Sequence, residues 1–134
     1  MEVKLLDTTL LVDVLRKREP AHRVLLAMEA AGERCATTEV NVFELLMGAY
    51  RRGRPDPNRL EGIAKLLDRL DVLPLERSGA SRAAEVLHKL RAEGRDLGLF
   101  DALVVGIALA SGCDAIVTRV EGYRPIRGLR VETY

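Results

Sequence analysis

Several residue types whose chemistry would identify a site at once are scarce in this chain. It contains no tryptophan, two cysteines and two histidines. Cys35 and Cys113 lie far apart in the sequence and lack the short spacing of zinc ligands, so we interpret them as small core residues rather than as a disulfide or a metal site. His22 and His88 fall in predicted helices and are expected at the surface or its boundary. Because no Cys–His or Ser–His pairing is supported, nucleophilic catalysis of those kinds is not indicated.

Long apolar runs, a strong net charge and glycine-rich loops are also missing. No run approaches the roughly 20 apolar residues that cross a bilayer, and the N-terminus has no signal-peptide pattern, so we expect a cytoplasmic protein without membrane contact. The net charge is only +1, so any RNA contact must come from local arginine clusters. The two phenylalanines and three tyrosines are too few for a base-stacking platform. No phosphate loop of the P-loop or dinucleotide type occurs.

The chain does contain a regular alternation of short apolar runs and helical patterns. It has 134 residues, 48% apolar and 31% charged, so residues 1–134 are expected to form one globular domain. The alternation indicates an α/β fold with a parallel sheet of four to five strands. Strands are predicted at 3–6, 35–38, 71–75, 114–118 and 129–131, with Pro74 favouring a sheet edge. Helices are predicted at 8–15, 20–31, 39–50, 58–70, 81–93 and 97–110, with N-caps at Thr8 or Thr9, Thr38 and Asp96.

Asp7 follows the first predicted strand directly. The apolar run stops at this carboxylate, and a helical pattern begins after it. Burying Asp7 within the strand would be costly unless it were paired or metal-bound, so the strand end is its expected place. In open α/β sheets the ligand crevice lies just beyond the carboxyl ends of the strands. We therefore expect other functional side chains to join Asp7 at that edge.

Two further acids interrupt otherwise apolar helices. Glu44 lies in the helix predicted at 39–50, where it shares a face with Asn41. Asp101 lies in the first turns of a helix that is apolar almost all round and is therefore expected to be buried. A single acid of this kind is usually a cap or half of an ion pair. Three carboxylates forced together would raise one another's pKa, and a hard divalent cation such as Mg²⁺ or Mn²⁺ is the usual relief.

The order and spacing of these residues resemble the PIN-domain family. Four short motifs and the tail from Tyr123 to Glu132, which resembles the ending of VapC-type toxins, carry the resemblance. The motifs are Leu5-Leu6-Asp7-Thr8, Glu44-Leu45 with Gly48, Leu97-Gly98-Leu99-Phe100-Asp101-Ala102-Leu103-Val104, and Val117-Thr118-Arg119. The resemblance implies a three-layer α/β/α sandwich and metal-dependent cleavage of RNA. It also implies a homodimer that is held inactive by a VapB-like antitoxin, which itself binds operator DNA.

The resemblance also suggests roles for individual residues. The acidic metal site of the family matches Asp7, Glu44 and Asp101. Supporting positions of the family match Thr8 and Thr118. Asn41, which shares a helix face with Glu44, is expected to support the same site. One position departs from the family pattern, because Val120 stands where many members have Asn or Asp as part of a fourth acidic position. Either the next residue, Glu121, reaches in from a slightly reshaped loop and joins the catalytic set, or the site uses three acids.

Arginine is the expected handle for the phosphate backbone of RNA, because its guanidinium binds phosphate through two parallel hydrogen bonds. One group comprises Arg51, Arg52 and Arg54, and another comprises Arg119, Arg124, Arg127 and Arg130. Arg119 is the preferred RNA contact, since it directly follows the strand end nearest the expected site.

The leading hypothesis is a metal-dependent endoribonuclease that acts as the toxin of a VapBC-type toxin–antitoxin pair. A degenerate PIN domain that binds RNA or protein without cutting is the alternative, and Val120 motivates it. A response-regulator-like domain with Asp7 as phosphoacceptor fits less well. Such domains place an acidic pair near the first strand and a lysine after a later strand, whereas the only late lysine, Lys89, lies in a predicted helix.

Overall fold

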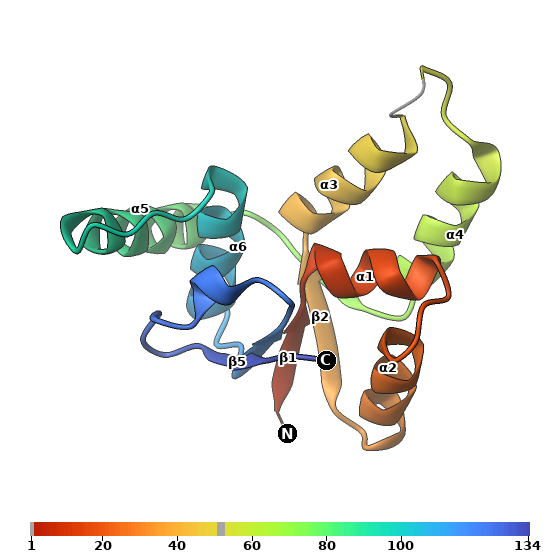
Figure 1. The fold of residues 1–134 in the computed structure, drawn as a ribbon, viewed down its shortest axis with the longest axis horizontal. Coiled ribbons are helices and arrows are strands. Elements are labelled where there is room, and N and C mark those ends of the chain that lie inside the picture. The colour runs from red at the N-terminus through yellow and green to blue at the C-terminus, as the bar shows by residue number, and fades with distance from the viewer. Residues whose placement is uncertain (1, 51–52) are drawn as a thin grey trace.

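A five-stranded parallel sheet forms the centre of the molecule (Figure 1). The computed structural model describes residues 2–50 and 53–134. The strands are β1 (Val3–Leu6), β2 (Arg34–Thr38), β3 (Asp71–Leu73), β4 (Ala115–Val117) and β5 (Arg130–Glu132). Their order across the sheet is β3-β2-β1-β4-β5, and every pairing between neighbours is parallel. The predicted α/β fold with four to five parallel strands is confirmed.

Helices connect the strands. They are α1 (Thr8–Leu15), α2 (Ala21–Ala30), α3 (Glu39–Ala49), α4 (Pro57–Leu67), α5 (Arg77–Ala92), α6 (Leu99–Ala110) and the short 3-10 helix η1 (Glu121–Tyr123). Helix α5 begins at Arg77, a turn earlier than predicted. Strand β3 lies at a sheet edge as predicted, and it ends at Leu73 because Pro74 has no N–H for a sheet hydrogen bond. In the part of the chain that the structure describes, no helix has the length and apolar character needed to span a bilayer.

The predicted N-cap of α3 is confirmed, whereas the predicted N-cap of α1 is wrong. The Thr38 hydroxyl accepts a hydrogen bond from the backbone N–H of Asn41, and the Asn41 side chain accepts one from the backbone N–H of Thr38, which forms a capping box. At α1 the prediction of Thr8 or Thr9 is wrong. Asp7 occupies the N-cap position there and makes no side-chain cap hydrogen bond.

The predicted cap of α6 is also wrong. This helix begins at Leu99, with Gly98 in the N-cap position. The carboxylate of Asp96 instead accepts hydrogen bonds from the Arg91 guanidinium and from the backbone N–H of Leu97. The Asp96 side chain therefore bonds to the backbone of the next residue and does not cap the helix.

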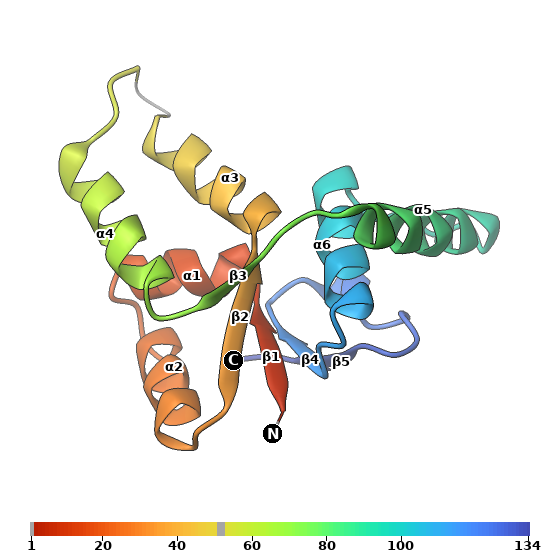
Figure 2. The ribbon, with the colours of Figure 1, turned by 180° about the vertical axis from the view of Figure 1, so that it is seen from behind.

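Helices cover both faces of the sheet, which gives the three layers implied by the family resemblance (Figures 1 and 2). Helices α1, α2 and α4 pack on one face, α5 and α6 pack on the other, and α3 contributes to both cores. Because successive side chains of a strand point to opposite faces, Leu5 packs in the core with α5 and α6, and Leu6 packs with α1 and α2. The cysteines and histidines lie as predicted, with Cys35 and Cys113 buried and unbonded and His22 and His88 exposed or at the boundary.

Helices α5 and α6 approach each other closely at small residues. A Cβ added at Gly106 of α6 would lie 2.6 Å from the backbone N of Ala83 and would also meet the carbonyl oxygen of Gly79. Real Cβ atoms do not come this close to backbone atoms. Glycine at position 106 therefore sets the distance between the two helices.

The chain leaves β1 toward one side of the sheet and returns to its other side at β4. Strands β2 and β3 extend the sheet from one edge of β1, and β4 and β5 extend it from the other. Such a switch point is where ligands bind in open parallel sheets. Asp7 directly follows β1, and Thr118 directly follows its neighbour β4. The backbone N–H of Asp7 donates to the carbonyl of Val117 at 3.1 Å. The topology thus brings both residues to the expected edge.

Candidate active site

Asp7 lies buried at the switch point and is held by neutral donors. Its side chain is only 3% exposed. The Thr118 hydroxyl donates to Oδ2 at 2.7 Å, and the Asn41 amide donates to Oδ1 at 3.3 Å. Burial raises the pKa of Asp7, these hydrogen bonds lower it in part, and the charge of Asp101 raises it further. Asp7 is therefore oriented by its neighbours, but its charge is not balanced by them.

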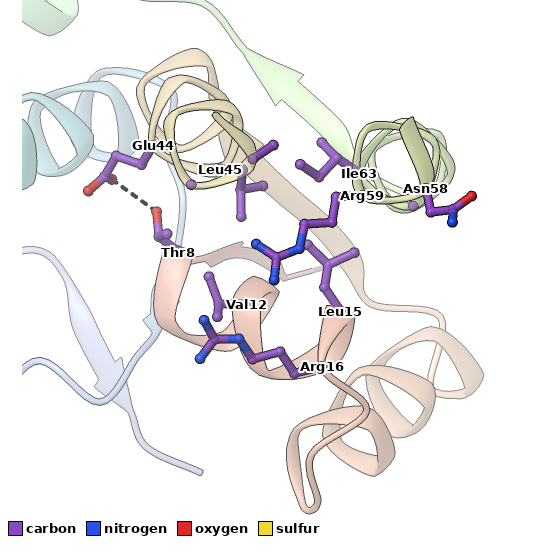
Figure 3. A pocket seen from close by; sticks show the side chains of 12 residues that line it. Thr8, Val12, Leu15, Arg16, Glu44, Leu45, Asn58, Arg59 and Ile63 are labelled. Atoms are coloured by element: carbon purple, nitrogen blue, oxygen red, sulfur yellow. Dashed lines mark hydrogen bonds between the residues drawn. The ribbon is translucent and has the colours of Figure 1, made fainter. Parts of the chain in front are cut away.

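A hydrogen-bond relay connects Asp7 to Glu44. The Asn41 amide, which donates to Asp7, also donates to the Thr8 hydroxyl at 2.9 Å. That hydroxyl in turn donates to Oε1 of Glu44 at 2.9 Å (Figure 3). Partial burial raises the pKa of Glu44, and the charges of Asp7 and Asp101 raise it further. The predicted supporting residues Asn41 and Thr8 thus bring two of the acids into one network.

Asp101 lies in the first turn of α6, where its charge raises the pKa of Asp7 and Glu44, and its hydrogen-bond partner was not predicted. The Tyr123 hydroxyl donates to Oδ1 of Asp101 at 2.8 Å, and the Tyr123 side chain is fully buried. Burial raises the pKa of Tyr123 far above its ordinary value, and the charges of Asp7, Asp101 and Glu44 raise it further. The phenol therefore stays protonated and acts only as a donor toward the acid. A lone aromatic residue in a polar C-terminal segment was the available signal for it.

The structure does not bring Glu121 to the other acids. Its side chain is 77% exposed and pairs with the Arg124 guanidinium at 2.6 Å. The preceding Val120 packs against the core, and its backbone N–H donates to the Thr118 hydroxyl at 3.0 Å. The short helix η1 then turns position 121 outward. Of the two alternatives for this loop, the described geometry does not support the one in which Glu121 joins the other acids.

Arg119 follows Thr118 as expected, but its guanidinium contacts the protein itself. It lies 3.1 Å from Oδ2 of Asp13, and its Nε donates to the Tyr134 hydroxyl at 3.1 Å. The Tyr134 hydroxyl donates to the same Asp13 oxygen at 2.8 Å, and Arg18 lies 3.6 Å from the other oxygen. Sequence reasoning missed this buried acid, because Asp13 sits in a helical pattern like any solvated residue.

In the described part of the chain, the other arginines that were considered for RNA contact make no ion pair with Asp7, Glu44 or Asp101. Arg124 pairs with Glu121, and Arg130 pairs with Glu2 and Glu132. Arg54 and Arg127 are exposed, and Arg51 and Arg52 lie outside the described residues.

The acidic group has the donor chemistry that a hard divalent cation requires. Asp13 is balanced by two arginines, whereas no lysine or arginine in the described ranges pairs with Asp7, Glu44 or Asp101. Within residues 2–50 and 53–134, no three acidic, histidine or cysteine side chains lie close enough together to hold a metal ion between them. Mg²⁺ commonly binds through one or two carboxylates and completes its shell with water and substrate phosphate. The residues fit an ion bound in that manner.

A cavity of about 490 Å³ opens beside the acidic group, between α1, α3 and α4 (Figure 3). Thr8 and Glu44 form part of its wall at the end nearest the other acids. The remaining lining consists of Val12, Leu15, Arg16, Leu45, Gly48, Ala49, Asn58, Arg59, Gly62 and Ile63. Oxygen ligands for a cation thus adjoin a space large enough for part of a substrate.

Comparison with characterised proteins agrees with this geometry. The chain is 25% identical over 130 residues to a tRNA(fMet)-specific endonuclease VapC of Shigella flexneri, and the match covers 97% of this chain and 96% of that protein. Among solved structures, a VapBC2 complex of Rickettsia felis bound to a promoter DNA fragment has a similar chain, with a TM-score of 0.87, 19% identity and 98% coverage of both chains. DNA-bound VapBC of Salmonella typhimurium gives a TM-score of 0.85 and 23% identity, covering 99% of this chain and 98% of the other.

The family resemblance found in the short motifs is confirmed by a match along most of the chain. The family model of the PIN domain matches residues 4–124, a range that includes Asp7, Glu44 and Asp101. This chain belongs to the PIN domain family.

Proposed function

We propose that this chain is a metal-dependent endoribonuclease and the toxin of a VapBC-type toxin–antitoxin pair. The observation that carries the proposal is the burial of Asp7, unpaired with any cation in the described ranges, at the switch point of the sheet, where Asn41 and Thr8 link it to Glu44. The charge of Asp101 also raises the pKa of both Asp7 and Glu44. Similarity to VapC of Shigella flexneri over nearly the whole of both chains supports RNA as the substrate. A binding-only PIN domain is less favoured, because such a module has no need for a buried carboxylate without a cation beside it.

Asp7, Glu44 and Asp101 would hold Mg²⁺ or Mn²⁺. The bound ion would lower the pKa of a water molecule and stabilise negative charge on the leaving oxygen of the phosphodiester. The chain's own hydroxyl groups have orienting roles, since Thr118 fixes Asp7 and Tyr123 fixes Asp101.

A VapB-like antitoxin and a second copy of this chain are the proposed protein partners. The similar solved chains come from VapBC complexes, which supports the antitoxin. An exposed apolar patch supports the homodimer, because contiguous apolar surface of this kind marks interaction sites. The patch contains Phe43, Met47 and Tyr50 from the region of α3, and Leu99 and Phe100 from α6. The rings of Phe43 and Phe100 already pack edge to face, with centroids 5.5 Å apart.

The proposal is tested by RNA cleavage with Mg²⁺, with Mn²⁺ and with a chelator. Asp7→Asn, Glu44→Gln and Asp101→Asn should each abolish metal-dependent cleavage. Glu121→Gln is the matched control and should retain it, because Glu121 pairs with Arg124 at the surface. Cleavage that survives both aspartate substitutions and the chelator would overturn the mechanism. Calorimetric titration with Mn²⁺ separates the binding-only alternative, which requires no divalent site.

A further inference from the structure

The cavity beside Glu44 has a character different from that of the acidic group. Its volume of about 490 Å³ lies within the range of small-molecule sites. Apolar side chains from three helices form much of its wall, including Val12 and Leu15 of α1, Leu45 of α3 and Ile63 of α4 (Figure 3). A metal ion and its water shell do not need an apolar wall of this kind, so the cavity requires an explanation of its own.

Two arginines extend into this space from opposite helices. Arg16 follows the end of α1 and Arg59 lies in the first turn of α4, and both guanidinium groups point toward the space between these helices (Figure 3). In the described part of the chain, no carboxylate lies within ion-pair distance of either one. By contrast, the nearby Arg18 and Arg119 both pair with Asp13. Two unpaired guanidinium groups beside an apolar wall are suited to an anion that also carries apolar surface.

Two glycines keep the cavity open without any packing requirement. A Cβ at Gly48 of α3 would meet nothing within 4 Å, and a Cβ at Gly62 of α4 would meet only Leu15, at 3.8 Å. Glycine weakens a helix interior relative to alanine. These positions therefore sacrifice helix stability and leave room inside the cavity.

We propose that this cavity is a nucleotide pocket, which binds the nucleotide next to the phosphodiester that is cut. Arg16 and Arg59 bind its phosphate, while the apolar wall packs against the sugar and base. Glu44 lies at the end of the pocket and also in the acidic group, so a nucleotide bound here would lead the chain of an RNA to the metal. The pocket rests on the proposed function and extends it by naming where the RNA beside the cut is held. The unpaired positive charges favour RNA over a neutral peptide as the occupant.

Binding of a fluorescent single-stranded RNA oligonucleotide to the full-length chain tests the pocket. Anisotropy is measured over a series of KCl concentrations, with Ca²⁺ in place of Mg²⁺ so that the readout does not depend on cleavage. Arg16→Gln and Arg59→Gln should each weaken binding about tenfold, because each removes a charge-assisted hydrogen bond. Each should also reduce the slope of log K against log salt by about 0.7, the value for one phosphate contact on single-stranded nucleic acid. Arg82→Gln, on the exposed surface of α5, is the control and should change neither quantity.

A second variant fills the pocket without removing charge. Gly48→Leu should weaken RNA binding at least about tenfold while leaving the melting temperature unchanged or raised, since its Cβ has open space. Unchanged RNA binding in the Arg16→Gln/Arg59→Gln double variant would overturn the proposal. So would an absence of RNA binding by the unaltered chain. Loss of binding to a polyglutamate peptide, with RNA binding intact, would overturn it in favour of an acidic protein segment.

The outcome is separable from that of the proposed function. If the unaltered chain binds RNA through these arginines but shows no metal-dependent cleavage, the nuclease proposal fails and the nucleotide pocket stands. If the double variant binds and cleaves the oligonucleotide as the unaltered chain does, the nucleotide pocket fails alone.

Discussion

The two helical layers of this protein use glycine for opposite purposes. In the layer of α5 and α6, Gly106 allows the helices to touch, and a Cβ there would collide with backbone atoms of Gly79 and Ala83. In the layer of α1 and α4, together with the adjoining α3, Gly48 and Gly62 line a cavity of about 490 Å³. A Cβ at Gly48 would meet nothing within 4 Å, and one at Gly62 would meet only Leu15 at ordinary contact distance. The comparison indicates that one layer is closed for stability, whereas the other gives up stability to leave a binding space.

Buried acids show a related contrast. Asp13 is 5% exposed and is balanced by Arg18 and Arg119. Asp7 is 3% exposed and receives only neutral donors, Thr118 and Asn41 among them. A buried acid that lacks a cation is costly to the fold. Asp13 therefore acts as a structural residue, while the arrangement at Asp7 is suited to an external cation.

The largest expected effect comes from a substitution in the tightly packed layer of α5 and α6. Gly106→Ala should lower the free energy of unfolding by about 3 kcal/mol or more, because the added methyl group must push α5 and α6 apart. Urea unfolding followed by circular dichroism measures this. Gly62→Ala is the matched control and should not destabilise the protein, since its Cβ meets only Leu15 at ordinary contact distance. Equal effects of the two substitutions would contradict the contrast between the layers.

Removing the buried donor at Asp101 should have the next largest effect. Tyr123→Phe deletes the hydroxyl that donates to Oδ1 of Asp101, and hydrogen bonds to charged groups contribute roughly 2 kcal/mol. Unfolding in urea should therefore show a loss of about that size, and metal-dependent cleavage should fall about tenfold through misorientation of the acid. Tyr50→Phe, at a side chain that is 49% exposed, is the control. Stability and cleavage that are both unchanged in Tyr123→Phe would rule out the orienting role.

A smaller effect, a gain in stability rather than a loss, is expected when the negative charge of Asp7 is removed. Folding raises the pKa of Asp7 above its ordinary value of 3.8, so in the pH range just above 3.8 the folded chain holds a proton that the unfolded chain has released. The metal-free protein should therefore lose stability as pH rises from 3.8 through the raised pKa, and it should stay less stable above that value. Asp7→Asn should remove this part of the loss and raise the melting temperature at neutral pH.

Thermal melts with a chelator, from about pH 4 to about pH 8, check this prediction. Adding Mn²⁺ should raise the melting temperature of the unaltered chain and have little effect on Asp7→Asn, because ligands that bind only the folded state stabilise it. Asp68→Asn, at an exposed residue just after the end of α4, serves as the comparison. A melting temperature that falls in Asp7→Asn at neutral pH would contradict the reasoning.

The smallest expected effect comes from a substitution in the layer that contains the cavity, formed by α1 and α4 with the adjoining α3. Gly48→Ala should raise the free energy of unfolding by about 0.5–1 kcal/mol, because alanine loses less backbone entropy in a helix and its methyl group meets nothing within 4 Å. Chemical denaturation is again the measurement. A loss of stability instead of a gain would mean that position 48 is already packed, and the open character of this layer would be in doubt.

The main features of the fold could be predicted because they follow from local patterns. Each strand is a short apolar run, and Asp7, Glu44 and Asp101 each interrupt an apolar element, which made them candidates for the site. The pattern does not separate them completely, because Asp13 also interrupts an apolar helix and is buried. Thr38 could also be predicted as a cap from a local pattern, because it directly precedes the helical pattern that begins at Glu39. Boundaries failed where two local contacts compete, as at Asp96, whose carboxylate accepts from its neighbours rather than capping α6.

The remaining parts of the site depend on contacts that no local pattern encodes. Tyr123 meets Asp101, and Tyr134 meets Asp13, only because the C-terminal segment folds back over the end of the sheet. The outward orientation of Glu121 depends on Val120 entering the core. The cavity beside Glu44 likewise arises from the packing of three helices, and the role of its glycines cannot be inferred until their neighbours are known.

The capping box of α3 has a consequence for the way this protein would lose activity. The oxygen of the Asn41 side chain is bound to the backbone N–H and the hydroxyl of Thr38, so its amide nitrogen must face Asp7 and Thr8. Fraying of the first turn of α3 would rotate this amide and release two of the acids at once. Local opening and inactivation should then be a single cooperative event, and amide hydrogen exchange at Asn41 would report on both.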